Sequence, residues 1–271
     1  MIKWLACVFV LIASSAAADD LRLAVTTSFH NSGLADVLLP AIKDDTGMTV
    51  QLLVVGTGQA LRLGQAGDVD AILVHSPEAE HAFVANGYGT HRREIMYNDF
   101  VIVGPQSDPA GIGGADTAAE ALRRIAQVRP IFVSRGDDSG THKMEMTLWQ
   151  DAGRTPRGVW YRAVGAGMGA ALNTASGMNA YILTDRASWL NFANKADLAL
   201  LFWGDPALFN QYSYIPVHPG RHSHVKAALA QQLENWLTSA RAAQLIGSYT
   251  IGTERLFTFN ASGGSQVVGV D

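Results

Sequence analysis

Four segments of the sequence are rich in glycine and in hydroxyl-bearing side chains, and each follows an apolar stretch. They are Thr26-Thr27-Ser28, Gly56-Thr57-Gly58, Ser134 to Thr141 and Gly165 to Gly169. Each also precedes a stretch that we predict to be helical. The N-terminus of a helix carries unpaired N–H groups and a partial positive charge, and Ser and Thr add short donors. The four segments therefore favour an anion-binding site that needs few basic side chains.

Arg135 is the one formal cation within these four segments. Its planar fork of N–H donors suits a tetrahedral oxyanion. We expect one of the two following aspartates, Asp137 or Asp138, to hold Arg135 in place, and the other to cap the helix that begins near Ser139. Any single segment of this kind is more often a plain helix cap, and an arginine beside an aspartate is more often a surface ion pair. Four such segments in one chain favour binding.

Other chemistry-bearing patterns are missing or incomplete. Gly56-Thr57-Gly58-Gln59 lacks the Gly-Lys-Ser/Thr of a phosphate-binding loop, Gly165 to Gly169 lacks the acidic residue of a dinucleotide fingerprint, and no Gly-x-Ser-x-Gly elbow occurs. A cluster of three histidines could hold a metal, but that segment has no cysteine and no paired carboxylates: His218, His222 and His224. His75 follows a strand and could face a ligand cleft, but we favour its interpretation as a structural histidine with its hydrogen bonds satisfied. We therefore expect no enzyme, no bound metal and no cofactor.

Strand-forming and helix-forming stretches alternate along the chain, which predicts an α/β architecture with a mostly parallel sheet. In open sheets of this kind, ligands lie beyond the carboxyl ends of the strands, where all four segments should meet. We expect strands at 21–25, 49–55, 71–74, 100–103, 130–133, 160–164, 180–183, 198–202 and 212–217. We expect helices at 32–45, 59–65, 78–86, 117–127, from 139 onward, from 169 to 176, and at 223–239 and 240–247.

Composition and the first residues indicate an exported globular protein. The chain has 271 residues, is 48% hydrophobic and 16% charged, and its net charge of −4 gives no indication of a nucleic-acid partner. Lys3, the apolar run Trp4 to Ile12 and the small residues Ser14 to Ala18 have the pattern of a secretory signal peptide. We predict a signal peptide at 1–18, cleaved after Ala18. The only cysteine, Cys7, lies within it, so the mature chain should form no disulfide.

No Pro- or Ser-rich linker divides the chain, although it contains enough α/β units for two halves. This favours an arrangement in which one unit is inserted into the other and two extended segments cross between them. The candidate crossings are Tyr97 to Val103 and Tyr212 to Val217.

Taken together, these motifs resemble the substrate-binding proteins of tungstate ABC importers, the Tup-type branch of the periplasmic binding proteins. The resemblance extends from about Leu21 to Leu256. Its most specific motifs are Val55-Gly-Thr-Gly-Gln-Ala60, His75-Ser-Pro-Glu-Ala-Glu80, Met96-Tyr-Asn-Asp-Phe-Val-Ile-Val-Gly-Pro105 and Ser134-Arg-Gly-Asp-Asp-Ser-Gly-Thr-His142. Thr26-Thr27-Ser28, Gly167-Met168-Gly169 and Leu183-Thr-Asp-Arg186 add to it.

The resemblance implies a two-lobed, hinged, type II periplasmic binding fold with the ligand in a cleft between the lobes. It implies lobe 1 at 19–100 and 213–271 and lobe 2 at 101–212. The protein would be a periplasmic monomer that captures tungstate or molybdate and delivers it to a membrane permease. The residues that match the ligand-binding positions are Thr27, Ser28 and Thr57 in lobe 1, and Ser134, Arg135, Ser139, Gly140, Thr141, Gly167, Met168 and Gly169 in lobe 2.

Three alternatives remain open at the level of sequence. Phosphate keeps a proton near neutral pH, so a phosphate site benefits from an acceptor carboxylate, whereas a carboxylate would repel tungstate. The direction in which Asp137 and Asp138 point therefore separates the two ligands. An exported phosphatase would need a nucleophile beside a base or clustered metal ligands, and neither is evident. An exported anion sensor without transport would share the same sequence features.

Overall fold

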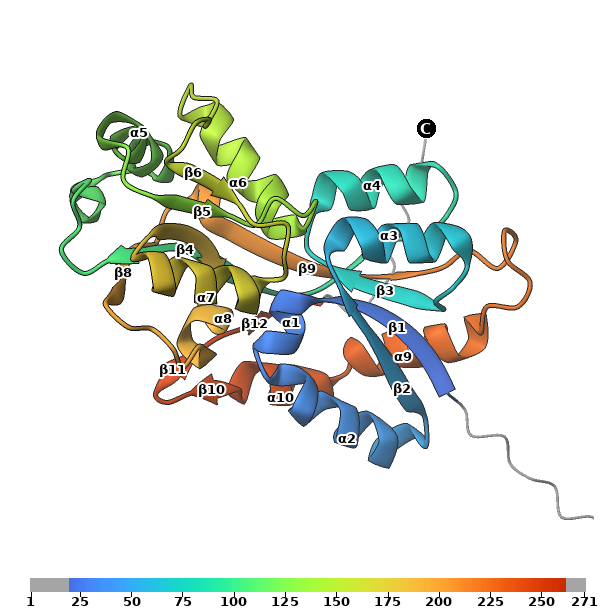
Figure 1. Ribbon diagram of the computed structural model, residues 1–271. Helices are drawn as coiled ribbons and strands as arrows, with labels where there is room; N and C mark the ends of the chain where they lie inside the picture. Colours follow the sequence, from blue (N-terminus) through green and yellow to red (C-terminus); the bar gives the residue numbers. More distant parts are fainter. Residues whose placement is uncertain (1–19, 262–271) are drawn as a thin grey trace, which may run out of the picture.

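The computed structural model describes residues 20–261, so the predicted signal peptide and residues 262–271 lie outside the described residues. A long mixed sheet runs through the molecule and helices cover both of its faces (Figure 1). The strands of this sheet are β1 (Asp20–Thr26), β2 (Thr49–Val55), β3 (Ala71–Val74), β4 (Arg93–Pro105), β5 (Phe132–Ser134), β6 (Tyr161–Ala163), β7 (Tyr181–Asp185), β8 (Leu198–Phe202), β9 (Phe209–Pro216) and β12 (Thr258–Phe259). A small hairpin adds β10 (Thr250–Ile251) and β11 (Glu254–Arg255).

The helices occupy most of the stretches that the sequence predicts. They are α1 (Thr27–Asn31), α2 (Leu34–Thr46), α3 (Thr57–Ala66), α4 (Pro77–Ala85), α5 (Ala118–Val128), α6 (Gly140–Asp151), α7 (Met168–Met178), α8 (Arg186–Asn191), α9 (Ala227–Leu237) and α10 (Ala240–Ser248), with short 3₁₀ turns η1 (Ile112–Gly114) and η2 (Pro206–Leu208). No helix of residues 20–261 is long and apolar enough to span a membrane.

The prediction of a mostly parallel sheet is wrong, because two long strands run against their neighbours. The strands run in the order β2-β1-β3-β9-β4-β7-β5-β6. β1 is parallel to β2 and β3, and β5 is parallel to β6 and β7. β9 is antiparallel to β3 and β4, and β4 is antiparallel to β7 and β8. Two parallel halves are thus joined by an antiparallel pair.

β4 and β9 contain the two segments that the sequence proposes as crossings. The first part of β4 pairs with β9 and β12, and its second part, from Phe100 onward, pairs with β7 and β8. In Figure 1 these strands pass through the middle of the molecule, with β1, β2 and β3 at one end and β5 and β6 at the other. The residues at which lobe 1 gives way to lobe 2 remain a prediction.

The helices differ from the prediction at two places in particular. A short helix that was not predicted, α1, begins at Thr27 ahead of α2, because the Thr26 side chain caps it by accepting the N–H of Phe29 at 3.1 Å. The helix expected at 223–239 begins only at Ala227. The backbone N–H of Lys226 binds the Asp70 carboxylate at 2.8 Å, and His222 and His224 are held by carbonyls at the end of α3. These long-range contacts keep 222–226 out of the helix.

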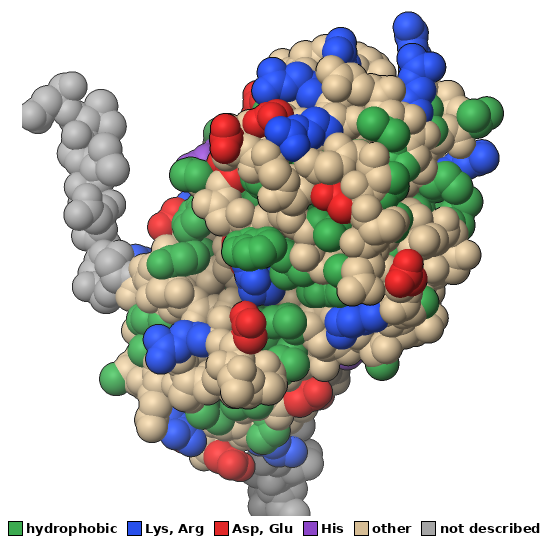
Figure 2. Space-filling model, turned by 90° about the vertical axis from the view of Figure 1, so that its left-hand side faces the viewer, with side chains coloured by type: hydrophobic (Ala, Val, Ile, Leu, Met, Phe, Trp, Pro, Cys, Tyr) green, Lys and Arg blue, Asp and Glu red, His purple; other side chains and the backbone are tan. Residues whose placement is uncertain are grey.

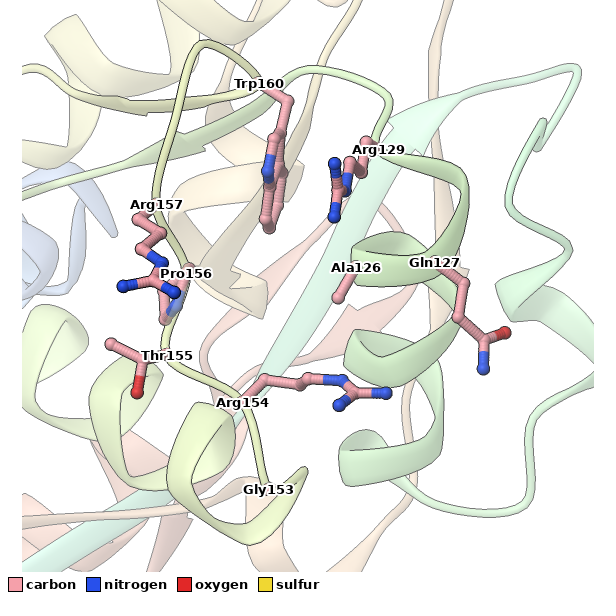
Figure 3. Close-up of a pocket in the computed structure, with 9 residues that line it drawn as sticks. All are labelled: Ala126, Gln127, Arg129, Gly153, Arg154, Thr155, Pro156, Arg157 and Trp160. Atoms are coloured by element: carbon pink, nitrogen blue, oxygen red, sulfur yellow. The ribbon is translucent and has the colours of Figure 1, made fainter.

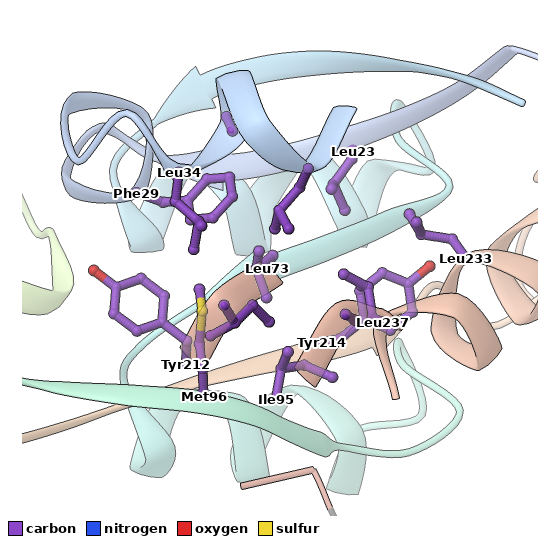
Figure 4. Packing of buried hydrophobic residues seen from close by; sticks show 14 of the residues in the cluster. Leu23, Phe29, Leu34, Leu73, Ile95, Met96, Tyr212, Tyr214, Leu233 and Leu237 are labelled. Carbon is purple, nitrogen blue, oxygen red and sulfur yellow. The ribbon is translucent and has the colours of Figure 1, made fainter. Parts of the chain in front are cut away.

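Buried apolar residues on both faces of the sheet fix the strand ends that carry the candidate site. In β4, Phe100 and Ile102 pack into one core cluster and Val101 and Val103 into another, so this part of the strand is buried on both sides. Figure 4 shows the cluster in which Leu23, Phe29, Leu73 and Tyr212 pack with residues of α2, α9 and α10. Full burial of one such side chain contributes about 1.5–3 kcal/mol, so the end of β1 is held firmly.

Candidate functional site

The N-termini of four helices meet where the two lobes face each other. Thr57, at the start of α3, accepts the N–H of Gly140 at the start of α6, with a distance of 3.1 Å between nitrogen and Oγ1. Thr27, at the start of α1, accepts the N–H of Met168 at the start of α7 at 3.4 Å. The N–H of Gly58 donates to the carbonyl of Asp138 at 3.2 Å. The structure thus brings together all four segments that the sequence singles out.

Glycines allow this close approach. A Cβ atom on Gly58 would lie 2.0 Å from Oδ2 of Asp138, and one on Gly140 would lie 2.7 Å from the His75 ring. A Cβ atom on Gly167 would lie 3.2 Å from the methyl group of Thr27. Contacts under 3.0 Å are closer than packed side chains tolerate, so these positions of α3 and α6 depend on glycine as the lobes stand here.

Arg135 lies at the centre of this region and is only 2% exposed. Its Nη2 donates to Oδ2 of Asp137 at 2.5 Å, and its Nε donates to the carbonyl of Ala166 at 3.3 Å. These two contacts leave other N–H groups of the guanidinium to bind a ligand. A buried arginine with one carboxylate partner is a cation held in a fixed direction, which suits recognition of a tetrahedral anion.

The two aspartates do not divide the two expected roles between them. Asp137 both holds Arg135 and accepts the N–H of Ser139 at 3.2 Å, while Ser139 itself caps α6. Asp138 does not cap the helix, because it forms ion pairs with Lys143 at 2.6 Å and with Arg62 at 3.4 Å. The hydrogen bond from Lys143 is the main cause that holds the pKa of Asp138 below its usual value. Both carboxylates are therefore engaged by cations.

Several hydroxyl groups of the predicted site are buried without a hydrogen-bond partner. Within residues 20–261, this holds for Ser28 Oγ, Ser134 Oγ and Thr141 Oγ1. Native proteins rarely leave buried polar atoms unpaired, since each costs about 1–3 kcal/mol. Thr27 and Thr57 use their oxygens as acceptors, which leaves their O–H protons free to donate. The site thus offers a shell of donors, which is what a fully deprotonated oxyanion requires.

Gly167, Met168 and Gly169 contribute backbone only. The Met168 side chain is fully buried in the core of lobe 2 with Ala171 and Leu172, so it cannot contact a ligand in the cleft. Its N–H and that of Gly169 lie in the first turn of α7, where N–H groups have no helical acceptor.

Sequence reasoning missed a set of buried polar groups on β3, β4 and β9. His75 lies 4.8 Å from the ring of Tyr212 and 5.9 Å from that of Phe100. Burial, and next the nearby charge of Arg135, lower its pKa to about 3, so the ring is neutral. In the described part of the chain, its Nδ1 has no partner, and neither has Asn98 Nδ2 or Tyr212 OH. The interpretation of His75 as a satisfied histidine is therefore wrong for Nδ1.

The interpretation of the sequence considered Asp137 and Asp138 but not a third carboxyl group, that of Asp185. It is fully buried at the start of α8, where one oxygen accepts the N–H of Ser188 at 2.8 Å. Burial raises its pKa, which favours the protonated form. Ser28 Oγ lies beside this carboxyl without the geometry of a hydrogen bond. Asp185 is thus a buried carboxyl beside Ser28, one of the residues of the predicted site.

Glu145 lies behind Ser134 and should make the stability of the protein depend on pH. Its carboxyl is buried and accepts from Tyr161 OH at 2.7 Å and from Trp149 Nε1 at 3.1 Å. Burial raises its pKa to about 7, against these opposing hydrogen bonds. The stabilising proton is fully bound below pH 4.5 and is lost as the pH rises through 7, which removes up to about 3 kcal/mol.

Glu145→Gln stays neutral at every pH and should lose this dependence. In urea denaturation between pH 5 and 8, we expect the unfolding free energy of the wild type to fall relative to that of Glu145→Gln. Taking the difference between the two proteins cancels the contributions of all other titrating groups. Parallel pH curves would show that Glu145 is already ionised at pH 5.

The three histidines considered as metal ligands each have a backbone contact. His218 Nδ1 accepts the N–H of Gly220 at 3.0 Å. His222 Nε2 lies 2.9 Å from the carbonyl of Gln65, and His224 Nε2 lies 2.9 Å from that of Gly67. Both bind the C-terminal end of α3, where carbonyls lack helical partners. Across residues 20–261, no group of three His, Cys, Asp or Glu side chains is placed to hold a metal.

Comparison with known proteins defines the class to which this fold and site belong. The sequence profile of the PBP superfamily domain matches residues 12–241, so the chain belongs to the PBP superfamily, as the predicted two-lobed fold requires. The crystal structure of the tungstate ABC transporter from Geobacter sulfurreducens is 47% identical and superposes with a TM-score of 0.79, covering 85% of this chain and 99% of that one.

Relatives with narrower names confirm the resemblance seen in the motifs. The tungstate-binding protein TupA of Peptoclostridium acidaminophilum is 44% identical over 252 residues, which cover 91% of this chain and 87% of the relative. The structure of the tungstate-binding protein TupA from Desulfovibrio alaskensis G20 is 44% identical with a TM-score of 0.75, covering 90% of this chain and 100% of that one. A putative ABC transporter anion-binding protein of Haloferax volcanii is 42% identical over 248 residues, covering 90% of this chain and 72% of the relative.

Proposed function

We propose that this protein is an exported substrate-binding protein that captures tungstate or molybdate and delivers it to the permease of an ABC importer. The observation that carries the proposal is the donor shell around Arg135, in which three buried hydroxyls lack partners within the described residues. The names of the relatives from Peptoclostridium acidaminophilum and Desulfovibrio alaskensis G20 support the ligand. The protein acts in the periplasm after cleavage behind Ala18, as a monomer and without catalysis.

The residues proposed to bind the anion do so with three kinds of donor. Hydroxyl groups come from Thr27, Ser28, Thr57, Ser134, Ser139 and Thr141. Backbone N–H groups come from the N-terminal ends of α6 and α7, at Gly140, Gly167, Met168 and Gly169. Those of Gly140 and Met168 donate to Thr57 and Thr27 in this structure, so they would exchange these bonds for bonds to the anion. Arg135 supplies the positive charge. A shell made only of donors fits a dianion that carries no proton. Phosphate keeps a proton near neutral pH and would have to lose it to fit the same shell.

The order of anion affinity tests this proposal. We expect tungstate to bind at least as tightly as molybdate, followed by sulfate and then phosphate. Sulfate has shorter bonds to oxygen, so donors set for tungstate would be stretched, and phosphate carries a proton that a donor shell cannot accept. At a ligand concentration of 100 times Kd, the melting temperature should rise by roughly 5–10 °C. Differential scanning calorimetry of the mature protein with each anion measures this order.

Phosphate as the tightest ligand would overturn the donor-only site. It would mean that a carboxylate accepts the proton of phosphate, and loss of the preference in Asp185→Asn would identify ionised Asp185 as that acceptor. If none of the four anions raises the melting temperature, the four segments act only as helix caps. A transport protein delivers its bound anion to a permease, whereas an anion sensor does not. Stimulation of a reconstituted permease by the loaded protein therefore separates these two roles.

A further inference from the structure

A second cavity opens at the end of lobe 2, away from the candidate anion site. Its volume is about 740 Å³, and it lies between the last turn of α5 and the loop that follows α6 (Figure 3). The proposed anion site lies at the start of α6, whereas this cavity lies beyond its end at Asp151. A helix of 12 residues is about 18 Å long, so the two regions are well separated.

The cavity is lined by three arginines and one indole ring, and we call it the arginine cavity. Its full lining is Ala126, Gln127, Arg129, Gly153, Arg154, Thr155, Pro156, Arg157 and Trp160. Figure 3 shows Arg129 and Arg154 reaching toward the hollow from its two sides, with the Trp160 ring beside Arg129. No carboxylate is part of this lining. The volume lies in the range of about 300–1,000 Å³ that is typical of sites for small ligands.

The three guanidinium groups lack the partners that arginines have elsewhere in this chain. Among the described residues, no ion pair or side-chain hydrogen bond involves Arg129, Arg154 or Arg157. By contrast, Arg186 forms a two-point contact with Asp99 at 2.5 and 2.8 Å. Like charges in one hollow repel, and a bound anion removes that repulsion. Several basic side chains, with acidic ones among them, also lie at the top of the face in Figure 2.

A purely structural role would be to neutralise the carbonyls at the ends of α5 and α6. Arg124 shows how this chain builds such a contact, since it donates to the carbonyl of Gly111 at 2.5 Å and to that of Gly114 at 2.9 Å. None of the three cavity arginines donates to a carbonyl in this way within residues 20–261. Their guanidinium groups are therefore available to a ligand, and helix ends do not account for three of them.

The backbone around the cavity holds its walls in a defined shape. Arg129 has a φ of 59°, and Gly153 has a φ of 64°, so both helices end in the left-handed conformation. Glycine adopts this conformation readily, but arginine rarely does. Pro156 restricts the loop that carries Arg154 and Arg157. Val128 and Val159, each next in sequence to a lining residue but not part of the lining, expose 55% and 81% of their surface.

We propose that the arginine cavity binds a phosphate-bearing polyanion, either free in solution or as the headgroup of an anionic lipid. Planar guanidinium groups recognise phosphate oxygens through paired hydrogen bonds, and three of them match a ligand with several phosphate charges. The Trp160 ring gives such a ligand an apolar surface beside the charges. This site is separate from the proposed tungstate site and does not depend on it.

Calorimetry with inorganic tripolyphosphate tests the site on the mature protein saturated with tungstate. We expect one tripolyphosphate per protein, with affinity that falls as salt is raised. The triple variant Arg129→Ala/Arg154→Ala/Arg157→Ala should bind at least about tenfold more weakly, which corresponds to about 1.4 kcal/mol. Arg162→Ala is the matched control, since it removes one exposed positive charge on β6 outside the cavity. It should change the affinity less than about twofold, given the small worth of exposed charges.

A second arm separates the two sources of phosphate. Vesicles of phosphatidylglycerol and phosphatidylcholine are sedimented with the wild type and with the triple variant. Sedimentation with phosphatidylglycerol alone, lost in the triple variant, assigns the site to a lipid headgroup, and tripolyphosphate binding alone assigns it to a soluble ligand. The proposal is overturned if neither probe binds, or if Arg162→Ala weakens binding as much as the triple variant. All substituted arginines are exposed, and melting curves confirm that the variants fold.

Discussion

Arg135→Ala should weaken the binding of tungstate by roughly a hundredfold or more, because each hydrogen bond from a charged donor contributes about 1.5–3 kcal/mol. Arg135 is 2% exposed and is the one cation within the four converging segments. Its removal has a second consequence, since the carboxylate of Asp137 loses its partner at 2.5 Å and is left near a dianion. Like charges in a poorly hydrated site repel strongly.

Isothermal titration calorimetry of Arg135→Ala measures this loss. Arg62→Ala is a matched control, because Arg62 also lies where the lobes meet and pairs with Asp138, but its side chain is 57% exposed. It should lose less than about fivefold in affinity, as exposed ion pairs contribute at most about 1 kcal/mol. The double variant Arg135→Ala/Asp137→Ala should recover part of the affinity. A folded Arg135→Ala protein that binds like the wild type would remove Arg135 from the site.

Gly58→Ala should weaken tungstate binding by roughly ten- to a hundredfold while leaving the fold intact. The added Cβ atom would lie 2.0 Å from Oδ2 of Asp138 and 2.9 Å from its carbonyl oxygen, so the lobes could not approach as they do here. Overpacking of this kind typically costs about 1–3 kcal/mol. Within α3 alone, alanine favours the helix over glycine by about 1 kcal/mol. Affinity should therefore fall although the ligand-free protein melts no earlier.

The comparison needs a glycine that is helical but makes no contact across the lobes. Gly177 in α7 has open space around it, so Gly177→Ala should bind tungstate like the wild type. Adding Asp138→Ala to Gly58→Ala removes the closest contact and should restore part of the affinity. Stopped-flow fluorescence locates the effect, which should be a faster release of tungstate. An unchanged release rate in Gly58→Ala would mean that binding does not require the approach of α3 to Asp138.

Most of the candidate site could be predicted from local patterns in the sequence. Thr57, Arg135 and Gly140 each stand between an apolar run and a helix, and that order of residues is itself the signal of a helix N-terminus at a strand end. His75, Asn98 and Tyr212 could not be found in this way. They lie in or beside apolar runs of β3, β4 and β9, and their buried polar atoms come together only because those strands are neighbours in the sheet.

The directions of β4 and β9 could not be predicted from the sequence either. Alternation of strands and helices indicates parallel neighbours within each half, and β1, β2 and β3 agree with that. β4 and β9 follow the same alternation, yet they pair antiparallel. Their direction depends on the path by which the chain leaves one half and returns to it, and no local pattern encodes that path.

The sequence by itself determined the chemical character of the site, because caps, glycines and a single arginine act through neighbours a few residues away. Only the tertiary structure decided which atoms remain free. Thr57 and Gly140 are 83 residues apart and Thr27 and Met168 are 141 residues apart, yet each pair forms a hydrogen bond. Likewise, Asp137 binds Arg135 while Asp138 turns to Arg62, which lies 76 residues away. Whether a polar atom has a hydrogen-bond partner depends on which groups lie within reach of it, and the packing of the two lobes determines this.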